Sequence, residues 1–245
     1  LRPLGEVRGN ILMAGSHDNA LDLLSAEIRG NFRNTSLCTS AVGSMAGLIA
    51  LRAGEAHLAG SHLLDLETGE YNWSHIRRYL KDREVVVVNF VQREQGILLP
   101  RGNPKGIRSV ADLVREEITI VNRQSGAGTR ILLDHLLAEA GVDSEAVRGY
   151  GSVETTHLAL GMAVAAGRAD CGLGIRAAAR LLGLDFVPLG SERFDFVIPA
   201  EHWDTIPLQR LVEILRREEF RARVRALGGY DTALSGRILD PPAPD

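Results

Sequence analysis

The feature that most constrains the fold is a regular alternation of strand-like and helix-like segments along the chain. "GNILMAGS" precedes the amphipathic stretch "DNALDLLSAEIRG", and "TSLCTSAVGS" precedes "MAGLIALRAGE". The same succession returns after "EVVVVNFVQREQGILLP", whose valines are typical of a strand buried on both faces. Because such alternation favours parallel sheets with helices on their faces, we predict an α/β fold.

Two such arrays on either side of one central strand predict two lobes. A chain of 245 residues, 45% of them hydrophobic, is long enough for two modest domains. No low-complexity linker occurs, so we expect segments near residues 87–92 and 187–197 to cross between the lobes. The predicted boundaries are 1–90 plus 193–245 for lobe 1 and 91–192 for lobe 2. Each lobe is expected to be a mainly parallel sheet flanked by helices, with a ligand cleft between the lobes at the carboxyl ends of the strands.

The C-terminal part of the chain carries two further structural predictions. "DFVPLGSERFDFVIPAEHW" indicates two short strands. "IPLQRLVEILRREEFRARVRAL" has apolar residues at helical spacing and predicts one long helix, which we expect to return to lobe 1.

Charge and composition exclude several classes of function. The formal net charge of -3 and the pI near 6.2 provide no basic field, so we expect no direct nucleic-acid binding by this chain. No run of 18 apolar residues occurs and the N-terminus lacks a signal-peptide layout, so we expect no membrane insertion. We interpret Cys38 and Cys171 as buried small apolar residues. His57 and His62 lie five apart, which matches no zinc motif, and neither a metal nor a cofactor is expected.

Five turns share one chemistry: "AGSHDNA", "AVGSMAG", "LAGSHLL", "RQSGAGTR" and "GSVETTH" each place a serine or threonine beside a glycine where a strand ends. One such hydroxyl is ordinarily a helix N-cap. Five together predict that hydroxyls and helix N-terminal N–H groups converge on an anion. The candidate ligand-binding residues are Ser16, Ser44, Ser61, Ser125, Gly126, Thr129, Arg130, Thr155 and Thr156.

Two arginines leave a second ligand open. Arg123 and Arg130 flank the fourth turn, and an arginine facing the ligand favours carboxylate or phosphate through bidentate pairing. The alternative ligand is therefore a small organic carboxylate effector, with its apolar part against residues such as Met45. If Arg130 instead lies on the helix surface, its guanidinium is solvated.

The sequence favours a non-catalytic module over an enzyme. We find no paired carboxylates, metal cluster or activated nucleophile with usable spacing, and the adjacent Ser16, His17 and Asp18 cannot generally orient one another as a triad. "SGAGTR" lacks the GK[ST] ending of a P-loop. A nucleotide-dependent enzyme is the alternative of another class, because Gly172–Ala177, "GLGIRA", loosely fits the dinucleotide fingerprint, with Glu192 further along.

Three segments carry a family resemblance: "QGILLPRGNPKGIRSVADL", "VNRQSGAGTR" before a helix, and "AAGRADCGLGI" before "DFVPLGSERFDFVIP". They resemble the type II periplasmic-binding-protein superfamily, specifically its molybdate- and tungstate-binding-like branch. The resemblance covers nearly the whole chain and implies a two-lobed protein that closes around a small oxyanion, with molybdate or tungstate as the first candidates. The superfamily also binds amino acids, sulfate, phosphate and aromatic effectors, so the ligand stays open.

Carried over by position, the resemblance places Ser16 and Ser44 at two hydroxyl contacts of the first lobe. Ser125, with Gly126, matches the second-lobe contact, and Thr155 or Thr156 matches the turn that follows. The chain departs from the transport-type pattern at Ser61 and His62. These residues, like His17, either add polar contacts or only cap and hydrogen-bond, and for His62 we favour the structural role.

The biological context rests on one segment. "GEAHLAGSHLLDLETGEYN" is similar to binding-protein-like domains that occur in the cytoplasm, fused to helix-turn-helix DNA-binding modules or to molybdopterin-biosynthesis proteins. The resemblance implies ligand sensing of the LysR substrate-binding kind in a transcriptional regulator whose DNA-binding domain is fused upstream. Because the chain starts at Leu, the alternative is a periplasmic or extracellular lipoprotein from which a signal peptide was removed.

Overall fold

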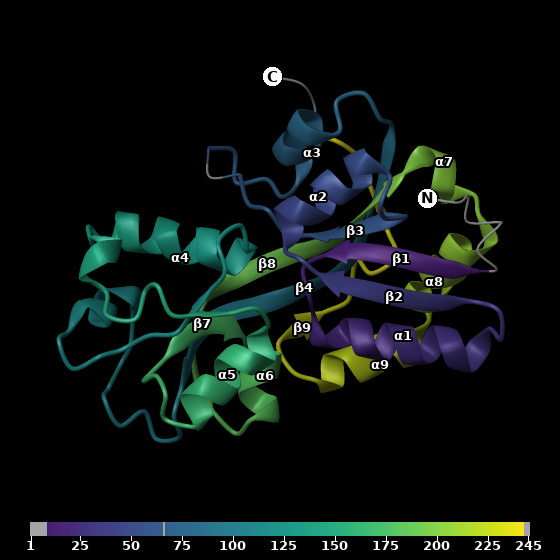
Figure 1. Cartoon of the computed structure of the whole chain (residues 1–245). Helices are drawn as coiled ribbons and strands as arrows, with labels where there is room; N and C mark the ends of the chain where they lie inside the picture. Colours follow the sequence, from purple (N-terminus) through teal and green to yellow (C-terminus); the bar gives the residue numbers. More distant parts are fainter. Residues whose placement is uncertain (1–8, 66, 243–245) are drawn as a thin grey trace. The chain divides into compact units, whose positions relative to one another are not determined.

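The computed structural model describes residues 9–65 and 67–242, which form two compact units. Unit 1 holds the described residues up to Gln92, Arg193–Ala226, and the described residues from Asp231 onward; unit 2 holds Arg93–Glu192 and Leu227–Tyr230. Two long strands, β4 (Val85–Leu99) and β8 (Asp185–Pro199), run from one unit into the other without a break (Figure 1). Residues 1–8, which include part of the segment examined for a signal peptide, lie outside the described residues.

Unit 1 is built on a mixed sheet with the strand order β10-β4-β8-β3-β1-β2. β1 pairs in parallel with β2 and with β3, whereas β3 pairs antiparallel with β8 and β4 with β10. Its other elements are β1 (Asn10–Gly15), α1 (Asn19–Asn31), β2 (Ser36–Ala41), α2 (Ser44–Ala53), β3 (Leu58–Ser61), α3 (Trp73–Tyr79), α7 (Ala200–Trp203), α8 (Ile206–Arg216), α9 (Glu218–Ala226) and β10 (Ile238–Leu239).

The helices of unit 1 form where the apolar spacing allows one face to be buried. α1 buries Leu21, Leu24 and Ile28 along one side and packs against β2, α8 and α9. α2 packs against β1 and β3 (Figure 1). It ends at Gly54, whose φ of 72° is the left-handed conformation that terminates many helices and that glycine adopts without steric cost.

The prediction of one long C-terminal helix is wrong, because the chain leaves helical geometry at Arg217 (φ -72°, ψ 130°). α8 buries Leu211 and Leu215, and α9 buries Phe220 and Val224. The step of five residues from Leu215 to Phe220 does not fit a single helical face. The interruption lets both apolar faces be buried.

The predicted pair of short strands at residues 185–199 is also wrong, because β8 is continuous. Glu192, which looks like a turn residue in the sequence, is a strand residue whose carboxylate forms an ion pair with Arg93 of β4. A charged residue in mid-strand is tolerated here because its partner is buried beside it.

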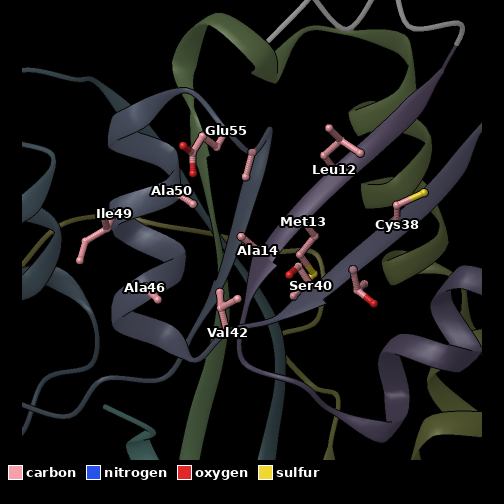
Figure 2. Close-up of a pocket in the computed structure, with 12 residues that line it drawn as sticks. Leu12, Met13, Ala14, Cys38, Ser40, Val42, Ala46, Ile49, Ala50 and Glu55 are labelled. Carbon is pink, nitrogen blue, oxygen red and sulfur yellow. The ribbon is translucent and has the colours of Figure 1, made fainter. Parts of the chain in front are cut away.

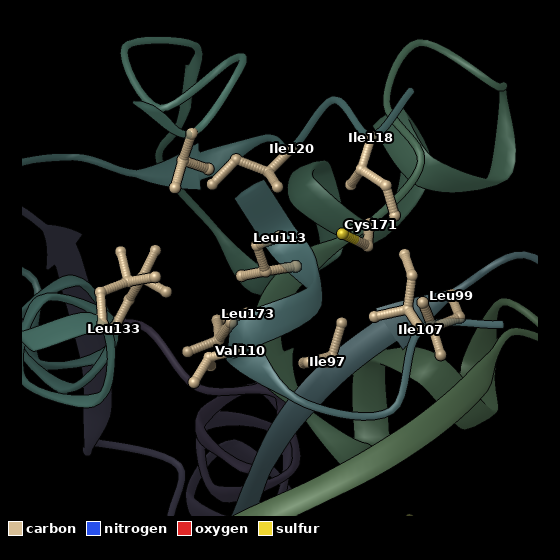
Figure 3. Packing of buried hydrophobic residues seen from close by; sticks show 12 residues of the cluster. Ile97, Leu99, Ile107, Val110, Leu113, Ile118, Ile120, Leu133, Cys171 and Leu173 are labelled. Carbon is tan, nitrogen blue, oxygen red and sulfur yellow. The ribbon is translucent and has the colours of Figure 1, made fainter. Parts of the chain in front are cut away.

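Unit 2 consists mainly of short strands and helices around one apolar cluster (Figure 3). Cys171 and Leu173 lie in this cluster with Ile97 and Leu99 of β4. The elements are the 3-10 helices η2 (Val110–Val114) and η3 (Ser144–Ala146), the strands β5 (Asn122–Arg123), β6 (Val153–Glu154) and β7 (Gly172–Ile175), and the helices α4 (Gly128–Glu139), α5 (His157–Ala165) and α6 (Arg176–Leu181). β9 (Tyr230–Asp231) pairs with β4, β7 is antiparallel to β4, and β5 is parallel to β6.

The two cysteines differ. Cys171 is buried as predicted, and burial raises the pKa of its thiol to about 12. The interpretation of Cys38 as buried is wrong, since its side chain is exposed. Cys38 belongs to the edge strand β2, and α2 covers β1 and β3 instead of β2. No helix of the described residues is long and apolar enough to cross a membrane.

Candidate anion-binding site

The carboxyl ends of three parallel strands bring Ser16, Ser44 and Ser61 to one edge of the sheet of unit 1. In the register of these strands, Gly15 of β1 lies beside Ala41 of β2 and Gly60 of β3. A Cβ on Gly47 would lie 2.8 Å from the Cα of Gly15, so α2 approaches β1 more closely than a larger residue permits.

The result of this close packing is a pair of buried hydroxyls. The Oγ atoms of Ser16 and Ser44 are 2.8 Å apart, and the two residues are 6% and 0% exposed. The sequence predicted both as ligand contacts, and the structure brings them into direct contact.

His62 completes this group, which we call the hydroxyl cluster: Ser16, Ser44 and His62. Its Nε2 lies 2.9 Å from Ser16 Oγ, and its backbone N–H donates to Ser44 Oγ at 3.2 Å. The imidazole ring is 3% exposed and stacks on Phe194, with ring centroids 5.5 Å apart and an interplanar angle of 19°. Stacking and hydrogen bonds therefore fix the position of the ring.

Neither serine of the cluster serves as an ordinary helix cap. Asp18 is the N-cap of α1 and accepts from the backbone N–H of Ala20 at 2.7 Å. The N-cap of α2 is Gly43, and among the described residues no side chain caps this helix. Ser44 is thus the first residue of a helix whose N-terminal N–H groups carry partial positive charge. These donors lie at the same edge as the hydroxyl cluster.

Ser61 belongs to a second polar network, centred on Asn72. The Ser61 hydroxyl donates to Asn72 Oδ1 at 2.7 Å, and the same oxygen accepts from the backbone N–H of Leu63 at 2.8 Å. Asn72 in turn donates to Asp195 Oδ2 at 2.9 Å and has a left-handed φ of 71°. These bonds fasten β3 and the segment after it to β8, so the hydroxyl of Ser61 is already used within the fold.

Asp195 is a buried carboxylate held by three donors. Besides Asn72, it accepts from Asn89 Nδ2 at 2.9 Å and from Arg193 Nε at 2.8 Å. Burial raises the pKa of Asp195, and the charge of Arg193 together with the amide hydrogen bonds opposes this shift. Because both carboxylate oxygens have partners, Asp195 acts within unit 1 as an anchor for the loop that ends at Asn72.

In unit 2 the predicted residues have different surroundings. Ser125 is exposed and Gly126 has a φ of 80° just before α4, whose N-cap, Ala127, provides no side-chain cap. Thr129 is buried and its Oγ1 accepts from Gln95 Nε2 at 3.1 Å. Thr156 is the N-cap of α5 and accepts from the N–H of Ala159 at 3.0 Å.

Thr155 is exposed, and its carbonyl oxygen accepts from Arg123 Nη2 at 2.8 Å. Since β5 and β6 are parallel neighbours, the turns that carry Ser125 and Thr155 leave the same edge of this two-stranded sheet. Within unit 2, these two exposed hydroxyls are therefore the ones best placed to meet a ligand.

The two arginines of the fourth turn are largely engaged. Arg130 Nε donates to Asp134 Oδ1 at 3.0 Å, and its guanidinium carbon lies 3.9 Å from the centroid of the Tyr150 ring. Burial lowers the pKa of Arg130, but hydrogen bonds with Tyr150 and Asp134 outweigh it and the net pKa is raised. Arg130 is thus a cation held on the surface of α4.

Arg123 belongs to a buried charge cluster with Arg93 and Glu192. Its Nε donates to the carbonyl of Glu154 at 3.2 Å. Burial and the neighbouring Arg93 lower the pKa of Arg123 to about 10, although Glu192 acts in the opposite direction. The Arg93 and Glu192 side chains, 0% and 4% exposed, form an ion pair. Arg123 therefore lies beside an ion pair whose two members act on its pKa in opposite directions.

Sequence reasoning missed the buried polar groups that hold these networks. Asn89 interrupts the valine-rich strand "VVVVNFV", and Asp195 stands between two phenylalanines in "FDFV". A single polar residue within an otherwise apolar strand indicates that its side chain has a buried polar partner. The partners themselves lie 106 residues apart in the sequence, a separation that no local pattern reports.

The features that suggested an enzyme have other roles. Gly172 and Gly174 lie within β7 instead of in a turn after it, and a Cβ on Gly172 would lie 2.5 Å from the carbonyl oxygen of Val121. These glycines permit close strand packing in unit 2. Ser16 is bonded to His62 and not to its neighbour His17, and Asp18 caps α1. In the described part of the chain, no group of three or more His, Cys, Asp or Glu side chains is placed to hold a metal ion.

Unit 1 also has a groove of about 450 Å³ lined by residues of α2, β1 and β2 (Figure 2). Leu12, Ala14, Val42 and Ile49 make much of its wall apolar, and Glu55 adds a carboxylate. No arginine, lysine or histidine is among the described residues that line it. This chemistry does not suit an anion, so the hydroxyl cluster is the better candidate.

Comparison with solved structures gives the class, which is the two-lobed α/β fold of periplasmic binding proteins. A putative phosphate ABC transporter substrate-binding protein with bound phosphate, from Clostridium perfringens, has a TM-score of 0.68 and 13% identity, with 89% of this chain and 98% of that chain covered. The tungstate ABC transporter from Geobacter sulfurreducens has a TM-score of 0.61 and 18% identity, with coverages of 86% and 95%. At these identities the likeness establishes the fold alone.

The chain belongs to the PBP-like family, described as a PBP superfamily domain, which matches residues 25–216. The uncharacterized protein YvgK of Bacillus subtilis (strain 168) is 36% identical over 232 residues, which cover 95% of this chain and 74% of YvgK. The predicted α/β fold class and the resemblance to type II periplasmic binding proteins are therefore confirmed.

Proposed function

We propose that the chain is a non-catalytic ligand-binding domain for a small oxyanion, with molybdate and tungstate as the first candidates. The observation that carries the proposal is the buried pair of hydroxyls of Ser16 and Ser44 at the uncapped N-terminus of α2. Hydroxyl and backbone N–H donors stabilise negative charge without a formal counter-charge. The phosphate- and tungstate-related proteins that share the fold support an oxyanion in this role.

The donor set also bears on which oxyanion is bound. Each hydrogen bond to an ionised oxygen contributes about 1.5–3 kcal/mol, so several support sub-micromolar affinity after the entropic cost of binding. A monoprotonated phosphate carries an O–H that needs an acceptor, and a set of donors leaves it unpaired. Sulfate has the same charge as molybdate, so only the size of the site discriminates between them. We therefore expect phosphate to bind more weakly than tungstate, molybdate or sulfate, and the size of the site to decide among these three.

Isothermal titration with these four anions tests the proposal. Ser16→Ala and Ser44→Ala each remove one donor, and we expect each to weaken tungstate binding about tenfold or more. Ser40→Ala is the matched control, because Ser40 is an exposed hydroxyl of β2 in the apolar groove. Ser125→Ala asks in the same assay whether a donor of unit 2 acts on the same ligand. Absence of binding by the unaltered protein for all four anions would refute the proposal.

The alternative ligand, a small organic carboxylate, requires an arginine that pairs with it. Arg130, however, pairs with Asp134, and Arg123 donates to carbonyl oxygens of its own unit. These contacts favour the hydroxyl cluster. If Arg130→Ala abolishes binding of a small carboxylate and the serine variants leave it unchanged, the arginine site is the correct one.

We further propose that the domain senses its ligand in the cytoplasm as part of a regulator with an upstream DNA-binding domain. Support comes from the segment "AGSHLLDLETGEYN", through its resemblance to such domains. The codons upstream of Leu1 test the proposal: a helix-turn-helix sequence supports it, and a lipobox or signal peptide contradicts it.

A further inference from the structure

The directions of the hydrogen bonds within the hydroxyl cluster decide which donors it offers a ligand. A serine hydroxyl has one proton to donate and can accept from other groups. Three contacts join the members of the cluster to one another: Ser16 Oγ to Ser44 Oγ at 2.8 Å, His62 Nε2 to Ser16 Oγ at 2.9 Å, and His62 N to Ser44 Oγ at 3.2 Å. A backbone N–H only donates, so Ser44 Oγ is an acceptor in the last of these.

The direction of the contact between His62 and Ser16 is set by the ring. If Nε2 is bare, Ser16 donates its proton to His62 and Ser44 donates to Ser16 Oγ, so neither hydroxyl has a proton left for an anion. If Nε2 carries a proton, it donates to Ser16 Oγ, one hydroxyl of the pair donates to the other, and one hydroxyl proton is left for the ligand. When Ser44 donates to Ser16, the proton that is left is that of Ser16. A protonated Nε2 therefore gives the site one more donor than a bare Nε2.

The ring cannot avoid this choice by rotating away. It is buried, it stacks on Phe194, and its own backbone N–H is bonded to Ser44. The placement of the proton on the ring, and not a movement of the side chain, then determines whether Ser16 faces the ligand as a donor.

We propose that His62 is a positioning residue that donates from Nε2 to Ser16 Oγ in the anion-bound protein and so directs the proton of Ser16 toward the ligand. The inference rests on the proposed oxyanion-binding function and adds a role to a residue for which the sequence favoured only a structural one. Either the neutral ring with its proton on Nε2 or the imidazolium satisfies it.

Two substitutions separate this role from mere packing. His62→Phe keeps a ring that stacks on Phe194 but has no N–H, and we expect tungstate to bind about tenfold more weakly. His62→Gln retains an N–H donor at a similar distance from the backbone, and we expect affinity within a few-fold of the unaltered protein. His135→Gln, on α4 of unit 2, is the control for loss of an imidazole elsewhere.

The measurements are isothermal titration with sodium tungstate and long-range ¹H–¹⁵N spectra of the tungstate-saturated protein, in which we expect a protonated Nε2. Equal or tighter binding by His62→Phe would show that Nε2 competes with the anion for the Ser16 proton, and the inference would fail. If His62→Phe does not fold, a bare Nε2 in the spectra or a loss of affinity in His62→Gln as large as in Ser16→Ala overturns it. If the unaltered protein binds none of the four anions, the proposed function and the role of His62 fall together.

Discussion

At the scale of single residues, hydroxyls in similar turns have different roles because their hydrogen-bond partners differ. Ser16 and Ser44 contact each other and His62, whereas Ser61 donates to Asn72 and Thr156 caps α5. Ser16, Ser44 and Ser61 each directly follow a glycine, so the local sequence does not distinguish these three. The distinction comes from which partner the rest of the fold brings within reach.

The two thiols give a residue-scale prediction. Burial raises the pKa of Cys171 to about 12, so at pH 8 it holds almost no thiolate and is shielded from reagents, while Cys38 is exposed. We expect a disulfide reagent such as dithionitrobenzoate to modify one thiol per native chain at pH 8 and two in denaturant. Cys38→Ser should abolish the native reaction and Cys171→Ser should leave it unchanged. Rapid reaction of both thiols in the native protein would contradict the described burial.

At the scale of elements, the strongest patterns were predicted well and the exceptions have physical reasons. The βα alternation and the valine-rich strand led to the correct fold class, because periodicity directly reports which face is buried. The division of α8 from α9 was missed, although the step of five between Leu215 and Phe220 was visible in the sequence. The length of β8 was missed because the ion pair of Glu192 with Arg93 joins residues 99 apart.

In the candidate site, too, some features could be predicted from the sequence and others could not. That Ser16 and Ser44 lie together could be predicted, because each follows a parallel strand and such ends meet at one edge of a sheet. The role of Asn72 could not be predicted, because its left-handed φ and its hydrogen bond to Asp195 depend on a strand that lies 123 residues away in the sequence. The sequence indicates which hydrogen-bond donors are present. Contacts between residues far apart in the sequence decide which of these donors already have a partner within the protein.

Two glycines in the long strands give an element-scale prediction. A Cβ on Gly96 of β4 would lie 2.2 Å from the carbonyl oxygen of Val187, whereas a Cβ on Gly190 of β8 meets nothing within 4 Å. We expect Gly96→Ala to lower the free energy of unfolding by about 1–3 kcal/mol through overpacking. Gly190→Ala should leave it within about 1 kcal/mol of the unaltered value or raise it. Urea unfolding followed by circular dichroism measures both, and equal effects would argue against the close approach at Gly96.

At the scale of the whole molecule, β4 and β8 cross the boundary between the two units, and the Arg93–Glu192 pair lies where each strand belongs to unit 2. Glu192→Gln leaves the charges of Arg93 and Arg123 without their carboxylate. We expect a loss of about 3–5 kcal/mol in the free energy of unfolding.

The double variant Arg93→Met/Glu192→Met should cost less than Glu192→Gln alone, because it leaves no unpaired member of the ion pair. Urea unfolding of Arg93→Met, Glu192→Met and the double variant completes the cycle. If the double variant is as unstable as the sum of the two single ones, the pair is not coupled as described.

The order of strands in unit 1 has a consequence for synthesis. β8 lies between β4 and β3, yet it is made only after all of β5, β6 and β7. Once the chain up to residue 180 has left the ribosome, it can assemble the apolar cluster of residues 97–173, but β3 and β4 still lack the strand that separates them. Each then presents an unpaired edge that another nascent chain can extend. The interval before β8 leaves the ribosome is therefore when this protein most needs protection from neighbouring copies of itself.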